Sequence, residues 1–260
     1  MSRISQRFEA LRAEGKKGLV VYIMAGDPDL ETTRQLILEL ERSGADIIEL
    51  GIPFTDPLAD GPSIQAANER ALASGTTLEA ILDFVRSMRE ETQIPILLMS
   101  SYNPIFRAGE ERLAREAVAA GVDGMLITDL PPEEAAEWKA TAAAAGLDTI
   151  FLLAPTSTDE RIRIASKISS GFVYCVSRTG VTGVQADLPP DLHGLLDRIR
   201  AETDQPIAVG FGVSKPEHVR QIGEWCDGAV VGSAVVNLIA KEGKDSVAAV
   251  GKFVRELKGA

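Results

Sequence analysis

The chain has 260 residues, of which 45% are hydrophobic and 25% are charged, and its formal net charge is −11. This composition is typical of a soluble globular protein with enough apolar surface for a large core. Proteins that bind the nucleic-acid backbone are normally basic, so the negative charge argues against DNA or RNA as a partner. No basic amphipathic run indicates an anionic membrane surface, and no apolar run approaches transmembrane length.

The two cysteines and the N-terminal segment are typical of a protein in a reducing compartment. Cys175 and Cys226 each lie in an apolar run, where cysteine usually acts as a small buried hydrophobic side chain. Their spacing fits neither a metal site nor a disulfide framework. Residues 1–14 are charged and amphipathic and lack the apolar core of a secretory signal. We therefore expect a cytoplasmic protein with no metal.

Short apolar runs rich in β-branched residues alternate with longer helical patterns along the whole chain. The runs predicted to be strands are residues 18–24, 46–52, 94–100, 124–128, 149–153, 172–176, 207–211 and 228–231. The helical patterns that follow them are residues 30–43, 78–91, 110–120, 132–145, 159–168, 189–201, 216–225 and 244–257. Runs that are nearly continuous in apolar residues are typical of parallel strands buried on both faces. The pattern predicts one (β/α)₈ TIM-barrel domain, residues 1–260, with an extra N-terminal helix; an open doubly wound sheet is the alternative.

Two connections are longer than the others, across residues 51–93 and residues 177–188. Each begins at the C-terminal end of a predicted strand. In a TIM barrel the active site lies at that face, so the long loops indicate where the chemistry takes place.

Glu49 interrupts the apolar run of the second predicted strand. Burying a carboxylate there is costly, and desolvation raises the pKa of a carboxyl group, which makes it a proton donor and acceptor near neutral pH. A structural salt bridge to a neighbouring strand is the alternative. The position alone does not favour one over the other.

The loop after this strand contains three prolines and two aspartates, Asp56 and Asp60. Either aspartate is suited to capping a turn or the helix that begins near Pro62. Either is equally suited to pointing across the barrel mouth at a substrate N–H or hydroxyl group, so the loop pattern leaves both roles open.

Glycine-bearing segments follow the last three predicted strands, at residues 179–183, 210–214 and 232–234. TIM barrels often bind phosphate in this region, with the N-terminus of a short extra helix. Residues 233–238 are predicted to form that helix after strand eight. Its free N–H groups would bind the phosphate, and glycine would permit close approach of the backbone.

The segment IELGIPFTDPLADGP at residues 48–62 resembles the signature of the tryptophan synthase alpha subunits. The resemblance extends over the whole chain, through AGDP at 25–28, YNP at 102–104, TDLP at 128–131, SRTGVTG at 177–183 and GFGVS at 210–214. Members of this family split indole-3-glycerol phosphate into indole and glyceraldehyde 3-phosphate by a retro-aldol cleavage.

The resemblance also implies roles for single residues. Glu49 would transfer the protons, and Asp60 would bind the indole N–H group and stabilise the cationic intermediate. The other residues implied in substrate and phosphate binding are Tyr22, Tyr174, Thr182, Gly183, Gly212, Gly232 and Ser233. Residues 177–188 would form a lid that closes over the substrate.

By the same resemblance, the chain would pair with a beta subunit in an alpha2-beta2 heterotetramer. Pro53 and Asp56 would lie near that contact. The partner would hold pyridoxal phosphate, and this chain would carry no cofactor.

In one position the chain departs from the family pattern. The family usually has an aromatic residue immediately before the Tyr-Asn-Pro triplet, and here that residue is Ser101. The departure concerns the indole end of the pocket. The departure keeps open a weakly active subunit whose main role is to activate its partner. A stand-alone lyase that releases free indole is a second alternative.

Overall fold

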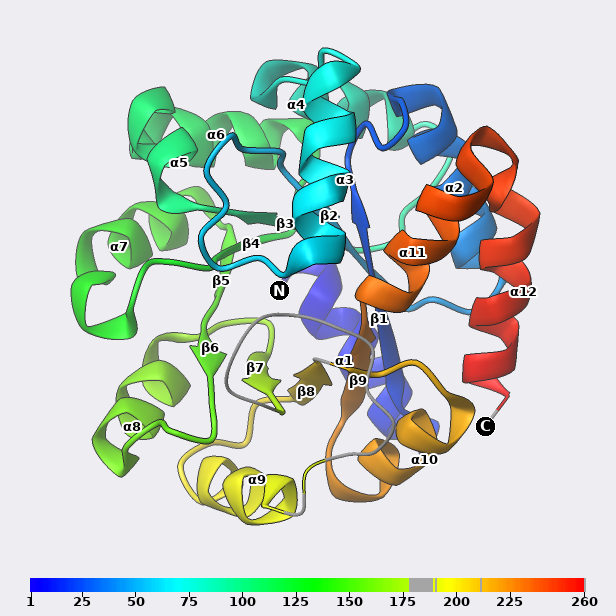
Figure 1. The fold of residues 1–260 in the computed structure, drawn as a ribbon. Helices are drawn as coiled ribbons and strands as arrows, with labels where there is room; N and C mark the ends of the chain where they lie inside the picture. The colour runs from blue at the N-terminus through cyan, green and yellow to red at the C-terminus, as the bar shows by residue number, and fades with distance from the viewer. Residues whose placement is uncertain (178–188, 190, 211, 260) are drawn as a thin grey trace.

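The computed structural model describes residues 1–177, 189, 191–210 and 212–259. Within these residues nine parallel strands form one sheet, in the order β5-β4-β3-β2-β1-β9-β8-β7-β6 (Figure 1). The strands are β1 (Gly18–Met24), β2 (Ile47–Gly51), β3 (Ile96–Ser100), β4 (Gly124–Ile127), β5 (Asp148–Ile150), β6 (Leu152–Leu153), β7 (Val173–Val176), β8 (Ile207–Gly210) and β9 (Gly228–Val231).

The predicted barrel is confirmed, with one difference in the fifth strand. The predicted strand at residues 149–153 forms two short strands, β5 and β6, on either side of Phe151. Strand β5 pairs with β4, and β6 pairs with β7, so the chain itself links the two ends of the sheet. Counted in this way, eight strand positions form a nearly closed ring, which is the architecture expected from eight βα units.

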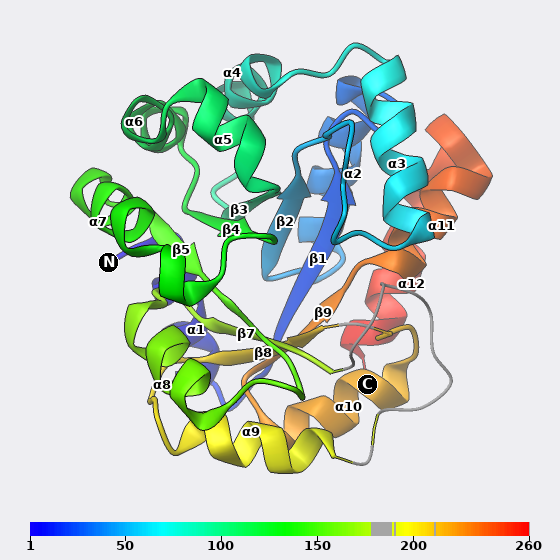
Figure 2. The ribbon, with the colours of Figure 1, turned by 60° about the vertical axis from the view of Figure 1, so that its left-hand side comes forward.

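The helices lie outside the strands, as Figures 1 and 2 show. They are α1 (Arg3–Ala13), α2 (Leu30–Arg42), α3 (Pro62–Ala73), α4 (Leu78–Met88), α5 (Tyr102–Ala108), α6 (Glu110–Ala120), α7 (Ala136–Ala145), α8 (Asp159–Ile168), α9 (Leu192–Arg200), α10 (Pro216–Trp225), α11 (Ser233–Glu242) and α12 (Ser246–Lys258). Within the described ranges, no helix has the length and apolar character needed to cross a membrane.

Three predicted helices differ at their starts, and one helix was missed. The patterns at residues 132–145 and 244–257 contain short 3₁₀ turns before α7 and α12, and the helix in the pattern at 189–201, α9, begins at Leu192. Helix α5 was not predicted from the sequence. It has only seven residues and includes Pro104, so it is too short to show a helical period.

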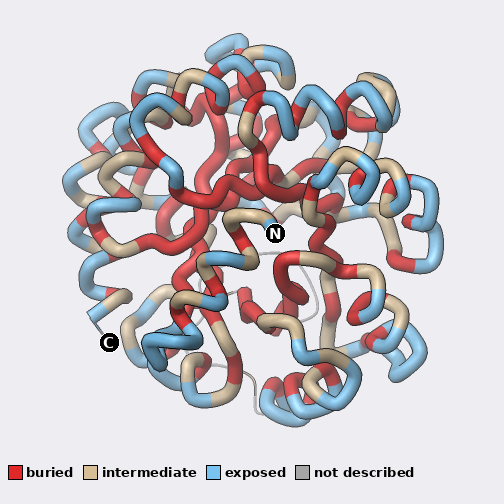
Figure 3. The backbone as a smooth tube through the Cα atoms, turned by 180° about the vertical axis from the view of Figure 1, so that it is seen from behind, coloured by how far each residue is buried: buried red, intermediate tan, exposed pale blue. Residues whose placement is uncertain are grey.

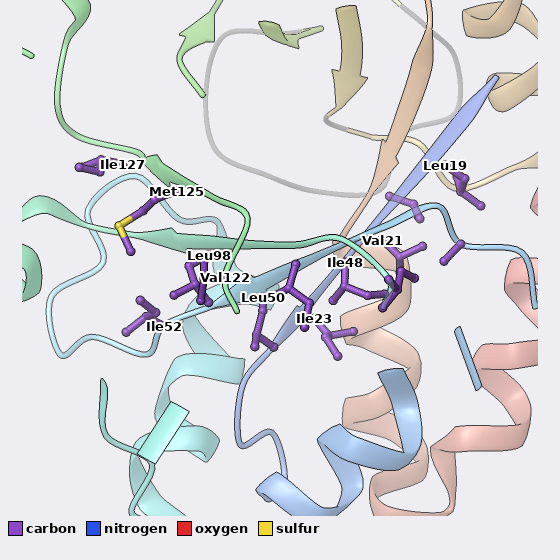
Figure 4. Packing of buried hydrophobic residues seen from close by; sticks show 14 of the residues in the cluster. Leu19, Val21, Ile23, Ile48, Leu50, Ile52, Leu98, Val122, Met125 and Ile127 are labelled. Carbon is purple, nitrogen blue, oxygen red and sulfur yellow. The ribbon is translucent and has the colours of Figure 1, made fainter. Parts of the chain in front are cut away.

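Strand β1 shows how side chains are divided between the two faces of the barrel wall. Leu19, Val21 and Ile23 belong to the large core between strands and helices, where Figure 4 shows them beside residues of β2, β3 and β4. Val20 belongs to a second cluster, and Tyr22 to a third. Since side chains alternate along a strand, the even-numbered residues of β1 face the barrel interior. The strands are buried and the outer helices are partly exposed (Figure 3).

Helix α1 covers the N-terminal ends of the strands. Phe8 and Leu11 lie within 3.5 Å of the position that a Cβ atom on Gly18 would take, at the start of β1. Arginines on the same helix pair with aspartates that precede strands: Arg3 with Asp123 at 2.9 Å, and Arg7 with the buried Asp46 at 2.5 Å. This end of the barrel is therefore closed, and the opposite end is left for a substrate.

Candidate active site

A pocket of about 700 Å³, part of it open to solvent, lies at the C-terminal ends of the strands. The residues that line it are Tyr22, Glu49, Ala59, Asp60, Ile64, Met99, Leu126, Thr128, Leu152, Tyr174, Gly212, Val213, Val230, Gly232, Ser233 and Ala234. The pocket thus combines an apolar wall with two carboxyl groups and the start of α11.

Glu49 points into this pocket because of its place in β2. Its neighbours Ile48 and Leu50 belong to the large core between strands and helices. Because side chains alternate along a strand, Glu49 points to the barrel interior. The side chain is buried, with 1% of its surface exposed, and its Oε1 atom has no hydrogen-bond partner among the described residues. Among the described residues, Glu49 forms no salt bridge to a neighbouring strand, which was the alternative left open by the sequence.

Burial raises the pKa of Glu49 to about 8, and the charge of Asp60 adds to the rise. This is the direction expected from desolvation of a carboxyl group. At neutral pH the side chain therefore holds its proton for most of the time. A protonated carboxyl group aimed into a pocket is suited to general acid catalysis, and its conjugate base is suited to the reverse transfer.

The structure separates the two aspartates of the β2–α3 loop. Asp60 lines the pocket, whereas Asp56 is exposed and does not line it. Asp60 does not cap the following helix, since the N-cap residue of α3 is Gly61, which has no side chain to accept a cap hydrogen bond. Pro53, in the same loop, is buried.

Asp60 is less strongly perturbed than Glu49. Burial raises its pKa to about 6, a hydrogen bond from Asn68 lowers it, and the charge of Asp129 raises it. At neutral pH Asp60 is therefore mainly ionised while Glu49 is mainly protonated. Two carboxyl groups with separated pKa values in one pocket are suited to different roles.

Asn68 on α3 holds the β2–α3 loop in place, and it was not predicted as a site residue from the sequence. Its side-chain Nδ2 donates to Asp60 Oδ2 at 3.0 Å, and its Oδ1 accepts from the Phe54 backbone N–H at 2.9 Å. It is buried, with 2% exposed. Its position beside Ile64 on the buried face of α3 was the available signal, because a buried amide must find hydrogen-bond partners.

Replacing Asn68 with Ala should lower kcat/KM by about 10-fold or more, since it removes a buried hydrogen bond worth roughly 1–3 kcal/mol. It should also raise the pKa of Asp60, because the hydrogen bond from Asn68 lowers that pKa. Since Asp60 must be ionised to act, the pH below which kcat/KM falls should therefore move to a higher value. Asn237→Ala, at an exposed position on α11, is the control. An unmoved acid limb in Asn68→Ala would show that Asn68 does not act through Asp60.

Two tyrosines line the pocket, and a strand-end glycine lies beside each. A Cβ atom on Gly51 would lie 2.3 Å from the Tyr22 hydroxyl, and one on Gly210 would lie 2.3 Å from the Tyr174 hydroxyl. A side chain at either glycine would therefore displace a tyrosine ring. Burial holds the pKa of both tyrosines well above the ordinary value, so both remain neutral hydroxyl groups.

The predicted phosphate-binding residues are only partly described. Gly212, Gly232 and Ser233 line the pocket, and α11 begins at Ser233 beside it. Gly212 has φ +85°, a left-handed conformation that favours glycine. Thr182, Gly183 and most of the predicted lid at 177–188 lie outside the described residues. No lysine or arginine lines the described part of this pocket.

Several apolar lining residues were not identified as site residues from the sequence. They are Met99, Leu126, Leu152, Val213 and Val230, all within or just after strands. For the four that lie in strands, the signal was the alternation of side chains along the strand; Val213 lies beyond the end of β8 and had no such signal. The site offers no sign of a metal centre: across the described ranges, no cluster of three or more His, Cys, Asp or Glu residues could hold a metal ion.

Comparisons with known proteins identify the family to which the chain belongs. A family model described as "Tryptophan synthase alpha chain" matches residues 8–259. A tryptophan synthase alpha chain from Geobacter sp. (strain M21) is 52% identical over 259 residues, covering 99% of this chain and 97% of that protein. Tryptophan synthase subunit alpha from Legionella pneumophila str. Paris has a solved structure with a TM-score of 0.91 and 39% identity, covering 100% of this chain and 98% of that chain. A structure of the tryptophan synthase a2b2 complex from Pyrococcus furiosus has a TM-score of 0.87 and 41% identity, covering 94% of this chain and 98% of that chain. The chain therefore belongs to the tryptophan synthase alpha chain family.

Proposed function

We propose that this chain cleaves indole-3-glycerol phosphate into indole and glyceraldehyde 3-phosphate, as the alpha subunit of a tryptophan synthase in tryptophan biosynthesis. The observation that carries the proposal is the buried Glu49 carboxyl group, which has no salt-bridge partner among the described residues and shares a pocket with Asp60 and the start of α11. Family membership gives the reaction, and this pocket supplies the groups that the reaction needs.

Protonation of the indole ring at carbon 3 begins the cleavage. Glu49, protonated near neutral pH, donates its proton to that carbon and becomes a carboxylate. The ring nitrogen then carries positive charge. Asp60, mainly ionised at the same pH, accepts the ring N–H and stabilises that charge. An ionised group held in a largely buried pocket is most effective at this point, because water there does not screen it.

The carbon–carbon bond breaks in the second step. The Glu49 carboxylate accepts the proton of the glycerol hydroxyl next to the ring, and the C–O group becomes an aldehyde. The electrons of the broken bond return to the ring and restore neutral indole. Glu49 ends protonated, as it began, so one carboxyl group acts first as an acid and then as a base.

The phosphate would be bound at the start of α11 by backbone N–H groups of Gly212, Gly232 and Ser233, together with Thr182 and Gly183 of the lid. Helix N-termini bind anions without a cationic side chain, because their first N–H groups have no partner within the helix. Tyr22 and Tyr174 would form the wall beside the substrate. The acidic net charge of the protein makes such local binding necessary.

Gly232→Ala should raise KM for the phosphorylated substrate by about 10-fold with a smaller effect on kcat. A Cβ atom at Gly232 would make only ordinary contact with Tyr22 at 3.5 Å, so the fold should tolerate it while a methyl group enters the phosphate site. Gly194→Ala on α9 is the matched control, because a Cβ atom there meets nothing within 4 Å. An equal loss with a substrate that lacks the phosphate would contradict the assignment.

The partner and the cellular setting also belong to this proposal. Residues 1–260 would act as one barrel domain in the cytoplasm and pair with a beta subunit that holds pyridoxal phosphate, in an alpha2-beta2 assembly. The β2–α3 loop would form part of that contact through Asp56, with Pro53 shaping the loop. Leu58 in the same loop is 81% exposed and Phe106 is 67% exposed, which suits a surface that a partner covers.

The direct test is an assay of indole-3-glycerol phosphate cleavage by the purified chain, with and without a beta subunit. We expect slow cleavage alone and a marked increase when the partner is added. High activity without the partner would favour a stand-alone lyase. Feeble cleavage under both conditions, combined with activation of the partner, would favour a mainly regulatory subunit.

A further inference from the structure

A second, smaller cavity adjoins the pocket at the C-terminal ends of β2 and β3. Its volume is about 240 Å³, including the part open to solvent. It has room for about one water-sized group. Tyr22, Asp60, Met99 and Thr128 line both cavities. The small cavity is thus a side extension of the proposed indole site.

Small side chains at the end of β3 keep this extension open. Ser100 and Ser101 line it, together with Phe54 and Pro57 of the β2–α3 loop. Ser101 is the N-cap residue of α5, but its side chain makes no cap hydrogen bond. Its hydroxyl group is therefore not needed to start the helix, and a larger side chain there would fill the cavity.

The proposed roles of Glu49 and Asp60 determine which edge of the indole ring faces the extension. Asp60 binds the ring nitrogen and also lines the small cavity. Carbons 7 and 6 lie on the nitrogen side of the ring, whereas carbon 4 lies on the side of carbon 3, where Glu49 transfers its proton. A group on carbon 7 would collide with the Asp60 carboxylate bound to the N–H. Carbon 6 is therefore the position from which a substituent reaches the extension.

We propose that this extension is a specificity subsite that accepts a methyl-sized group on carbon 6 of the indole ring, and that Ser101 keeps it open. The inference rests on the proposed cleavage of indole-3-glycerol phosphate, since the ring orientation comes from the assigned roles. The enzyme would then cleave 6-methylindole-3-glycerol phosphate and discriminate against the 4-methyl isomer.

The experiment compares kcat/KM for the parent, 6-methyl and 4-methyl substrates in wild type, Ser101→Tyr and Ser101→Ala. In wild type the 6-methyl substrate should react within about fivefold of the parent, and the 4-methyl substrate at least about 10-fold more slowly. Ser101→Tyr should lower the ratio of 6-methyl to parent by about 10-fold or more. Ser101→Ala, which leaves the space open, should keep that ratio. Calorimetric dissociation constants for 6-methylindole and 4-methylindole should show the same preference without turnover.

Two results separate this inference from the proposed function. If the parent is cleaved but the ratio of 6-methyl to parent is the same in wild type and Ser101→Tyr, the subsite is wrong and the cleavage stands. If the parent is not cleaved even with a beta subunit, the proposed function is wrong. In that case the binding constants still decide the subsite, because equal affinities for both methylindoles in wild type and Ser101→Tyr would overturn it.

Discussion

Glu49→Gln should lower kcat for indole-3-glycerol phosphate cleavage by about 10²–10⁴-fold, the range over which general acid–base catalysis contributes. Both proposed proton transfers use this one carboxyl group, so the loss should lie toward the upper end. Glutamine has the same shape as the protonated acid that is present at neutral pH. The dissociation constant of a non-cleavable analogue, such as indole-3-propanol phosphate, should therefore change little.

The pH–rate profile gives an independent check on this assignment. Glu49 must be protonated at the start, so kcat/KM should fall as the pH rises through about 8. Asp60 must be ionised, so kcat/KM should fall as the pH drops through about 6. The wild-type profile should therefore be bell-shaped, and the two limbs belong to the interacting pair rather than to independent groups. The residual activity of Glu49→Gln should keep the acid limb and lose the basic limb.

A matched control removes a carboxylate of the same type elsewhere. Glu9 is exposed on α1, at the closed end of the barrel, and Glu9→Gln should leave both the rate and the pH profile as they are in wild type. Turnover of Glu49→Gln close to the wild-type value would contradict the acid–base role.

Asp60→Asn should lower kcat/KM by about 10²–10³-fold, the usual cost of removing a preorganised electrostatic contact to the transition state. Asparagine keeps the size of the side chain and can still accept a hydrogen bond from the ring N–H. It cannot offset the positive charge that forms on the nitrogen when carbon 3 is protonated. The effect should therefore be on kcat more than on binding of the uncharged indole ring.

Asp56→Asn is the informative comparison because Asp56 lies in the same loop. In the isolated chain it should cost far less activity than Asp60→Asn, since Asp56 is exposed and does not line the pocket. Its main effect should appear in the affinity for a beta subunit. Similar losses for the two variants in the isolated chain would reduce Asp60 to a residue that stiffens the loop.

The loop that carries Asp56 and Asp60 shows the limit of local sequence patterns. Both aspartates fit a cap, a turn or a ligand contact. Asn68 distinguishes Asp60 from Asp56, because its Nδ2 atom donates a hydrogen bond to Asp60 while its Oδ1 atom accepts one from the Phe54 backbone N–H. These residues are separated along the chain by 8 and 14 positions. The contact exists only once the loop has closed onto α3, so neither periodicity nor propensity predicts it.

The sequence by itself determined the order of strands and helices, the barrel and the family, because hydrophobic periodicity and ordered motifs are local properties of the chain. It also placed Glu49 in the interior strand, although it left a salt bridge open. Tertiary structure alone decided that Glu49 Oε1 lacks a hydrogen-bond partner among the described residues, that two glycines accommodate the pocket tyrosines, and that Ser101 borders a side cavity. Each of these depends on side chains brought together from different strands and loops, and their pKa values and free space follow from that packing.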